Sequence, residues 1–250
     1  MYQRERENEI LKIVKKNGYV TVKYLVEQLH YSNATINRDL NSLERQKLVH
    51  RTYGGVELVQ TTGHGARPFR YHKEHVAKRK IAKAAAELVQ DGDCIFIDGT
   101  TTTQFIAEFL TDKKDVTVIS NNMAVITQAS ELGLQAVCLG GRLLEAPCML
   151  LSAETVENAK RYQADKAFIS TGYVSPDGRV GGGGLYAVLL ESMVQNSKQA
   201  YLLADAEKFE ERYKTREFCM ALSALTGIIT NHTIDETWRK NFPNAVFIEV

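Results

Sequence analysis

The chain has 250 residues, of which 44% are hydrophobic and 24% are charged. This balance is typical of a globular protein with one large or two modest domains, and it excludes a largely disordered or fibrous chain. No apolar run approaches the roughly 20 residues that a membrane-spanning helix needs, and the charged N-terminus is unlike a signal peptide. The four cysteines have no C-x-x-C spacing, so we expect reduced thiols in a cytoplasmic protein.

The net charge of +1 conceals a segregation of charge along the chain. Residues 1–80 carry 16 Lys and Arg against 8 Asp and Glu, a net charge of +8, whereas residues 81–250 carry a net charge of −7. A basic segment attracts phosphate-rich polymers, and an acidic body discourages non-specific adhesion of the rest of the protein. A basic face that is merely solvated gives the same pattern, so charge alone leaves nucleic-acid binding open.

The N-terminal part of the chain has helical periodicity followed by a hairpin pattern. Three short amphipathic helices and then two strands around a glycine turn are predicted over residues 4–16, 22–29, 32–44, 48–53 and 56–59. Thr21 and Ser32 are the expected N-caps of the second and third helices. Residues 60–77 form the predicted linker, because most of them lack periodicity and mix Gly, Pro and basic residues.

From residue 78 the pattern changes to alternating helices and strands. The predicted helices cover residues 78–89, 101–110, 124–132, 153–161 and 185–198. The predicted strands cover residues 94–98, 116–120, 135–139, 167–171, 200–204, 228–230 and 246–250. Alternation of this kind favours an α/β fold in which helices cover a mostly parallel sheet.

Segment 21–44 has the form of a helix-turn-helix, and the hairpin after it supplies a wing. Because Ile36 and Leu40 face the core, the first turn of the helix after Ser32 presents polar side chains that can contact base edges or phosphates. A three-helix protein-interaction module is the alternative. The candidate DNA-binding residues are Ser32, Asn33, Thr35, Asn37 and Arg38 in this helix, with His50, Arg51 and Tyr53 in the wing.

Glycines and small polar residues follow several of the predicted strands. The loop after strand 94–98 opens a helix, so its amides and threonine hydroxyls converge as in a metal-free phosphate site, although an N-cap that only satisfies the helix end is the alternative. Because ligands of parallel α/β sheets bind at the carboxyl ends of strands, we expect the other loops to complete one pocket. The candidate effector-binding residues are Asp98, Gly99, Thr100, Thr101, Thr102, Asn121, Gly140, Gly141, Gly172, Asp205 and Lys208.

The string SNATINRDLNSLERQKLVHRTYGGVEL resembles the N-terminal module of the DeoR family of bacterial transcriptional regulators. In that family a Ser-x-x-Thr-Ile-x-Arg-Asp-Leu helix precedes a wing that ends in Gly-Gly, although Asn37 here stands where Arg is common. The Asp98–Thr102 loop and the Asp205-x-x-Lys208-Phe209 segment are similar to the family's effector domain. The resemblance implies a small winged helix-turn-helix domain over 1–59 and a larger effector-binding α/β domain over 78–250 with a ribose-5-phosphate isomerase-like fold.

The resemblance implies a DNA-binding regulator, most typically a repressor of a carbohydrate uptake or catabolism operon, whose operator affinity a phosphorylated sugar or related metabolite controls. Its expected partners are double-stranded operator DNA, the effector and further copies of the chain in a dimer or tetramer. No membrane association is expected. The expected location is the bacterial cytoplasm, at the nucleoid when the protein is bound to the operator. A sugar-phosphate isomerase-like enzyme with an accessory DNA-binding head is the alternative. The strand end Ser170-Thr171-Gly172 lacks the carboxylate that such isomerases use, so no enzyme activity is expected.

No histidine or cysteine spacing matches a metal site, and no Ser/His/Asp arrangement is evident. The sequence therefore predicts no catalytic residue, no metal and no cofactor.

Overall fold

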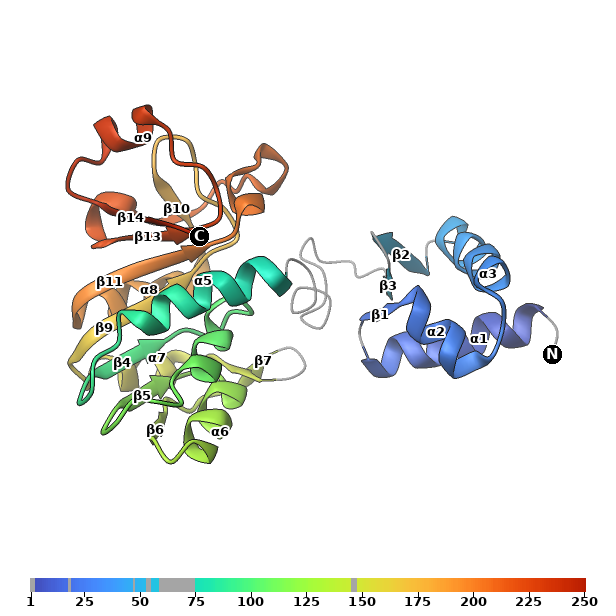
Figure 1. The fold of residues 1–250 in the computed structure, drawn as a ribbon, viewed down its shortest axis with the longest axis horizontal. Coiled ribbons are helices and arrows are strands. Elements are labelled where there is room, and N and C mark those ends of the chain that lie inside the picture. Colours follow the sequence, from blue (N-terminus) through green and yellow to red (C-terminus); the bar gives the residue numbers. More distant parts are fainter. Residues whose placement is uncertain (1–2, 18, 47, 53–54, 59–74, 145–147) are drawn as a thin grey trace. The chain divides into compact units, whose positions relative to one another are not determined.

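The structure is a computed structural model that describes the whole chain except residues 1–2, 18, 47, 53–54, 59–74 and 145–147 (Figure 1). The chain divides into two units, Met1–Glu74 and His75–Val250. The predicted wing residue Tyr53 and most of the predicted linker lie outside the described residues. No described helix is long and apolar enough to cross a membrane.

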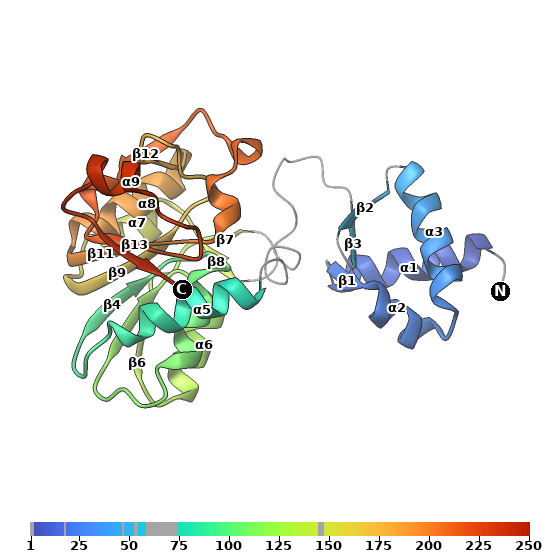
Figure 2. The same ribbon diagram turned by 45° about the horizontal axis from the view of Figure 1, so that its top comes forward.

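The described part of the first unit consists of three helices and a three-stranded antiparallel sheet of order β1-β3-β2 (Figures 1 and 2). In chain order its elements are α1 (Gln3–Asn17), β1 (Tyr19–Thr21), α2 (Val22–Leu29), α3 (Asn33–Arg45), β2 (Val49–Thr52) and β3 (Gly55–Leu58). Apolar side chains from these elements, Ile10, Leu25 and Ile36 among them, form one buried core. The predicted helix-turn-helix with a wing is confirmed, and the short strand β1 is an addition that the sequence did not predict.

Both predicted N-caps are confirmed. The Thr21 hydroxyl accepts a hydrogen bond from the backbone N of Tyr24 (3.1 Å), and the Ser32 hydroxyl accepts one from the backbone N of Thr35 (3.1 Å). Each bond satisfies an amide that the first turn of a helix leaves without an intrahelical partner. The position at which α3 begins is therefore fixed by a local side-chain contact.

A buried ion pair joins α1 to α3. The guanidinium of Arg6 donates to both carboxylate oxygens of Asp39, from Nε to Oδ2 (2.6 Å) and from Nη2 to Oδ1 (2.9 Å), and the Asp39 side chain is fully buried. The hydrogen bond to Asp39 raises the pKa of Arg6 above its ordinary value. Asp39 therefore helps to fix the orientation of α3 on the rest of the unit.

The second unit is built on a seven-stranded sheet of order β14-β13-β11-β9-β4-β5-β6. All its strand pairs are parallel, which confirms the predicted α/β class. Its strands are β4 (Cys94–Ile97), β5 (Thr117–Ser120), β6 (Gln135–Cys138), β9 (Ala164–Ser170), β11 (Ser197–Ala204), β13 (Gly227–Thr230) and β14 (Val246–Glu249). Two antiparallel ribbons that the sequence did not predict pair β7 (Leu143–Leu144) with β8 (Met149–Leu150) and β10 (Arg179–Gly181) with β12 (Phe218–Ala221).

The helices of the second unit differ from prediction in several places, and a short helix near the C-terminal end was not predicted from the sequence. They are α5 (His75–Glu87), α6 (Met123–Glu131), α7 (Ala153–Ala159), α8 (Gly184–Gln195) and α9 (Glu236–Asn241), with short 3-10 helices at η1 (Thr103–Phe109), η2 (Ala206–Phe209), η3 (Glu211–Tyr213) and η4 (Leu222–Ala224). Helix α5 begins three residues before the predicted boundary at residue 78, so residues 75–77 are helical and do not belong to the linker. Within the segment predicted as a helix over 101–110, residues 103–109 form the 3-10 helix η1, and the Thr103 hydroxyl in its first turn bonds back to the carbonyls of Asp98 and Thr100 in the preceding loop.

The sheet separates two apolar layers. Alternate strand residues such as Phe96, Ile119 and Leu202 pack with α7 and α8. Their neighbours along the strands, such as Ile97 and Leu203, are also buried and point to the opposite face, on which α5, η1 and α6 pack together (Figure 1). The strand order reverses between β4 and β9, since β4 to β6 extend the sheet in one direction and β9 to β14 extend it in the other. Such a reversal opens a crevice between the loops that follow the two central strands.

We predict that Asp39→Ala lowers the free energy of unfolding of the first unit by about 3–5 kcal/mol, because Arg6 keeps its charge in a largely buried position after the Asp39 carboxylate is removed. Hydrogen exchange of peptides from α1 and α3, measured over a urea series on the full chain, reports this unit separately from the second. Glu9→Ala, which breaks an exposed ion pair with Lys12 in the same unit, is the control and should change exchange little. Equal effects of the two substitutions would show that the buried pair does not stabilise the unit.

Candidate functional site

The loops that follow five neighbouring strands, β11, β9, β4, β5 and β6, lie at one edge of the sheet, because the carboxyl ends of parallel strands point the same way (Figure 2). Every predicted effector-binding residue is in the segment that follows one of these strands. The edge includes the point at which the strand order reverses, which is where ligands of open α/β sheets bind. The sequence thus placed these residues on one edge, and their contact with a ligand stays a prediction.

Asp98, directly after β4, is fully buried and accepts hydrogen bonds from three directions. Its Oδ1 accepts from the backbone N (2.9 Å) and hydroxyl (2.8 Å) of Thr100 and from the hydroxyl of Thr103. Its Oδ2 accepts from the backbone N of Ser170 after β9 (2.7 Å) and from the hydroxyl of Tyr186 in α8 (2.7 Å). Asp98 therefore joins its own loop, the next strand and a helix across the reversal point, and acts as a positioning residue.

The ionisation of Asp98 is opposed by its burial. Desolvation raises the pKa of Asp98 above its ordinary value, and the hydrogen bonds from Thr103, Tyr186, Thr100 and Ser170 act in the opposite direction with smaller effect. The group is thus held at a position where its charge is costly. The surrounding hydrogen-bond donors offset part of this cost, and they in turn depend on the Asp98 carboxylate for their orientation.

The threonine loop after Asp98 is closely packed and contacts a buried cation. The ammonium of Lys78, in the first turn of α5, donates to the hydroxyl of Thr101 (3.3 Å), and both side chains are buried. A Cβ atom at Gly99 would lie 2.8 Å from the Met149 side chain and 3.0 Å from the Asn121 amide nitrogen, so a larger residue there would have to displace these side chains. The loop therefore brings backbone amides and hydroxyls next to a positive charge.

Asn121 and Asn122, after β5, are buried and only partly satisfied. The Asn121 amide nitrogen donates to the carbonyl of Leu150 (2.9 Å), and Asn122 Oδ1 accepts from the backbone N of Ala124 as the N-cap of α6 (3.0 Å). Among the described residues, Asn121 Oδ1 and Asn122 Nδ2 have no hydrogen-bond partner. Buried polar atoms left without partners are uncommon in folded proteins, and they are expected where a ligand or ordered water completes the site.

Asp205 and Lys208 follow β11 on the other side of the reversal point. Asp205 is buried, and its Oδ1 has no hydrogen-bond partner within the described part of the chain. The backbone of Lys208 is fixed, since its N donates to the Asp205 carbonyl (2.9 Å) and its own carbonyl accepts from the N of Val174 (2.7 Å). Lys208 is half-buried as a residue, and its ammonium forms no ion pair with a side chain that the structure describes.

Gly140 and Gly141, after β6, pack against the start of α7. Both have positive φ, of 70° and 112°, and a Cβ at Gly141 would collide with the hydroxyl of Thr155. That hydroxyl donates to the Gly140 carbonyl (2.8 Å). The glycine pair is therefore required by the backbone conformation of this loop. Gly172, after β9, is exposed.

Three residues at this edge, Lys78, Tyr186 and Met149, were not predicted from the sequence, and only the position of Lys78 was indicated by a sequence pattern. Lys78 shares helical spacing with the buried Ile81, Ala82 and Ala85, so the periodicity of α5 already placed it on the inner face. Tyr186 and Met149 reach the Asp98 loop through pairings that no local pattern indicates.

The first turn of α3 presents the polar residues that the sequence predicted to contact DNA. Ser32, Asn33 and Arg38 are exposed, and Thr35 and Asn37 are half-buried. The Asn37 amide nitrogen donates to the backbone carbonyl of Asn33 (2.9 Å) and to its side-chain oxygen. The exposed turn therefore already contains ordered side-chain contacts.

The wing strand β2 contacts α3 through Arg51. Its guanidinium donates to the backbone carbonyl of Asn37 (3.4 Å) and to the side-chain oxygens of Asn37 and Asn41, and its backbone N donates to Glu44 Oε1 (3.0 Å). His50, next to it, is exposed. Arg51 thus connects the wing to the helix, and its predicted contact with DNA stays untested.

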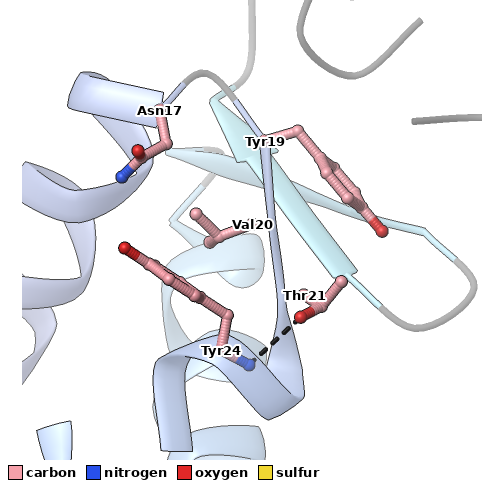
Figure 3. A pocket seen from close by; sticks show the side chains of 5 residues that line it. All are labelled: Asn17, Tyr19, Val20, Thr21 and Tyr24. Carbon is pink, nitrogen blue, oxygen red and sulfur yellow. Dashed lines mark hydrogen bonds between the residues drawn. The ribbon is translucent and has the colours of Figure 1, made fainter. Parts of the chain in front are cut away.

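A pocket of about 340 Å³ lies beside the start of α2, lined by Asn17, Tyr19, Val20, Thr21 and Tyr24 (Figure 3). Figure 3 shows the Thr21 hydroxyl bonded to the backbone N of Tyr24 at its wall. None of the predicted DNA-binding or effector-binding residues lines this pocket. Within the described residues, no group of three or more His, Cys, Asp or Glu side chains could hold a metal ion.

Two family models match the chain. Residues 6–62 match the DeoR-like helix-turn-helix domain, and residues 73–232 match the DeoR C terminal sensor domain. The chain belongs to the DeoR family. It is therefore a DNA-binding transcriptional regulator, and DNA binding is favoured over the alternative of a protein-interaction module.

This DeoR-family chain is 30% identical over 222 residues to the lactose phosphotransferase system repressor of Lactococcus lactis subsp. lactis, covering 84% of each chain. It is 28% identical over 211 residues to the glycerol-3-phosphate regulon repressor of Escherichia coli K12, again covering 84% of each. Among solved structures, ribose 5-phosphate isomerase A from Methanocaldococcus jannaschii matches 55% of this chain and 56% of its own, with 23% identity and a TM-score of 0.40.

We predict that the free energy of unfolding of the wild type, relative to Asp98→Asn, falls as pH rises above 3.8 through the raised pKa of Asp98 and then levels. The folded state binds the Asp98 proton more tightly than the unfolded state, so this stabilisation is complete below the unfolded pKa and is lost above the folded one. Urea unfolding at several pH values, followed by the fluorescence of the single tryptophan, Trp238, measures the difference in the second unit. A difference that rises with pH would mean that the donors around Asp98 outweigh its burial.

Proposed function

We propose that this DeoR-family regulator is a repressor of a carbohydrate uptake or catabolism operon, and that a phosphorylated sugar or related metabolite controls its affinity for the operator. The observation that carries the proposal is the gathering of lysines and unsatisfied buried polar atoms at one edge of the seven-stranded sheet. We call this edge, formed by the segments that follow β11, β9, β4, β5 and β6, the sensor edge. The names of the relatives, which refer to a phosphotransferase system and to a glycerol-3-phosphate regulon, support it.

The chemistry of the site fits a ligand that is both anionic and rich in hydroxyl groups. Lys78 and Lys208 supply positive charge, and the loop at Thr101 and Thr102 supplies amides and hydroxyls for a phosphate. The unsatisfied atoms Asp205 Oδ1 and Asn121 Oδ1 are both acceptors, so each requires an O–H or N–H donor. A sugar phosphate provides an anion for the first group and hydroxyl donors for the second.

The same site is proposed to sense its ligand without transforming it. The hydroxyls of Ser170 and Thr171, at the end of β9, donate to the carbonyls of Leu203 (2.6 Å) and Gly181, and no carboxylate lies in that strand end. Asp98 is occupied by protein donors, and Asp205 is a carboxylate at this edge whose Oδ1 has no partner among the described residues. An isomerase that works through an enediol needs an acid as well as a base beside the sugar, and the end of β9 supplies neither, which favours sensing.

A change at the sensor site is proposed to reach the DNA-binding unit through α5. The first turn of α5 contacts the threonine loop through Lys78, and the His75 ring packs edge-on against Phe105 of η1 at 5.0 Å. His75 is the first residue of the second unit, so α5 is its first element after the connection from the DNA-binding unit. A ligand that alters the position of α5 would alter DNA affinity if the two positions of α5 differ in operator binding.

The regulator is proposed to act as a homo-oligomer, a dimer or tetramer, in the cytoplasm at the nucleoid. One helix-turn-helix contacts few base pairs, and symmetric copies on repeated half-sites multiply the contacts.

We predict that Arg38→Ala weakens operator binding about 5- to 150-fold, the loss expected for one specific base contact. If Arg38 contacts a phosphate instead, the slope of log affinity against log salt concentration should become less steep by about one. The measurement is a gel shift at several salt concentrations with the full chain and the DNA upstream of its own gene. Arg45→Ala, at the exposed last turn of the same helix, is the control for loss of one positive charge. Equal losses in the two variants would remove Arg38 from the recognition surface.

We predict that Lys208→Met abolishes the response to sugar phosphates and leaves operator affinity in their absence unchanged, because it removes a cation from the sensor edge only. Operator release is measured against a panel of triose and hexose phosphates, with turnover of each compound followed in parallel. Lys198→Met, near the start of β11 and so at the opposite edge of the sheet, is the matched control and should respond like the wild type. An unchanged response in Lys208→Met would place the effector elsewhere, and turnover would favour the enzyme alternative.

A further inference from the structure

The side chains of Arg51, Asn37 and Asn33 form a continuous relay from the wing to the first residue of α3. Arg51 Nη2 donates to Asn37 Oδ1, and Asn37 Nδ2 donates to Asn33 Oδ1 and to the Asn33 backbone carbonyl (2.9 Å). The guanidinium is also held by the side-chain oxygen of Asn41, one turn further along α3. Four side chains on two elements therefore share one hydrogen-bond network.

The direction of this relay follows from the chemistry of its first member. A guanidinium has N–H donors and no acceptor, so the end of the Asn37 amide that faces Arg51 has to be the oxygen. The other end of that amide is then the NH₂ group, which only donates. The atom of Asn33 that faces Asn37 must accordingly be its oxygen, which leaves the NH₂ group of Asn33 as the end directed away from the relay.

Asn33 is exposed, and the N-terminal turn of a recognition helix is the part that approaches base edges. A free asparagine pairs with adenine by donating to N7 and accepting from N6 at the same time. In this chain the Asn33 oxygen faces Asn37 and accepts its hydrogen bond, so the end of the amide directed away from the relay is the NH₂ group with its two donor hydrogens. Two donors match the paired acceptors O6 and N7 of guanine and the O4 of thymine in the major groove, whereas adenine presents N7 beside a donor amino group.

We propose that the Arg51–Asn37 relay determines specificity by fixing the Asn33 amide so that it recognises a keto base, guanine or thymine, and rejects adenine. The inference rests on the proposed operator binding and adds the base class that one residue selects. Arg51 and Asn37 are positioning residues in this arrangement. Asn33 is the residue that contacts the base.

The test is selection of binding sites from a randomised duplex library by the full-length protein, followed by affinity measurements on all four bases at each selected position. The position that loses its preference in Asn33→Ala is the one that Asn33 recognises. The wild type should prefer guanine or thymine there over adenine by roughly 5- to 150-fold, the range of one specific base contact. Preference is a ratio of affinities, so uniform changes in binding strength do not affect it.

Breaking the relay should release the Asn33 oxygen. In Asn37→Ala and in Arg51→Met, discrimination against adenine at this position should fall to less than about threefold or reverse. Arg45→Met is the matched control, because it removes another arginine near α3 that lies outside the relay, and it should keep the wild-type preference. Hydrogen exchange of α3 peptides shows that each variant retains the fold.

Three results would overturn the proposed role of the relay in base specificity. They are a wild-type preference for adenine at the position that Asn33 recognises, the absence of any position that depends on Asn33, and an unchanged preference in both Asn37→Ala and Arg51→Met. Selection of no sequence at all by the wild type would instead contradict the proposed operator binding itself. The two failures are therefore distinguishable in one experiment.

Discussion

The buried carboxylate of Asp98 is the contact on which the sensor edge depends. It lies where the strand order reverses, and its two oxygens accept donors from its own loop, from the end of β9 and from α8. Because these donors come from segments far apart in the chain, an acceptor at their centre fixes the loops relative to one another. Its burial opposes ionisation and raises its pKa, so the position is costly and is sustained by the surrounding hydrogen bonds. Asp98 therefore shapes the site through its hydrogen bonds to three segments of the protein.

Opposite electrostatic conditions hold in the two units. The basic N-terminal segment favours a polyanion over a broad surface, and there the ordered contacts of Arg51 and the asparagines limit which side chains can respond to bases. The second unit lies in an acidic segment whose overall field opposes an anion. An anion can be held there only by local groups, and Lys78, Lys208 and the threonine loop are such groups at one edge. Proximity compensates for the unfavourable field, since Coulomb interactions fall with distance and are screened beyond about 10 Å.

The sequence was sufficient for features that local patterns encode and insufficient for those that distant pairing creates. Hydrophobic periodicity located the main helices and the strands of the parallel sheet, and the residues after each strand were expected at one edge because parallel strands share an orientation. The ribbon of β10 and β12 joins short segments that are far apart in the chain, and neither carries a pattern of its own. Tyr186 reaches Asp98 for the same reason. Lys78 was within reach of prediction, because its spacing with Ile81 and Ala85 placed it on a buried face.

The position of Lys78 also decides how much free energy an effector could transmit. A regulatory coupling of about 1–3 kcal/mol alters affinity about 5- to 150-fold. Two unit charges about 4 Å apart interact by about 4 kcal/mol at an effective dielectric constant of 20, the value typical near a protein surface. A single phosphate charge next to the Thr101 loop and Lys78 is therefore of sufficient magnitude, even after part of it is offset by desolvation. Because Lys78 lies in the first turn of the helix that begins the second unit, this interaction acts on the element nearest in sequence to the DNA-binding unit, and no rearrangement of the sheet core is required.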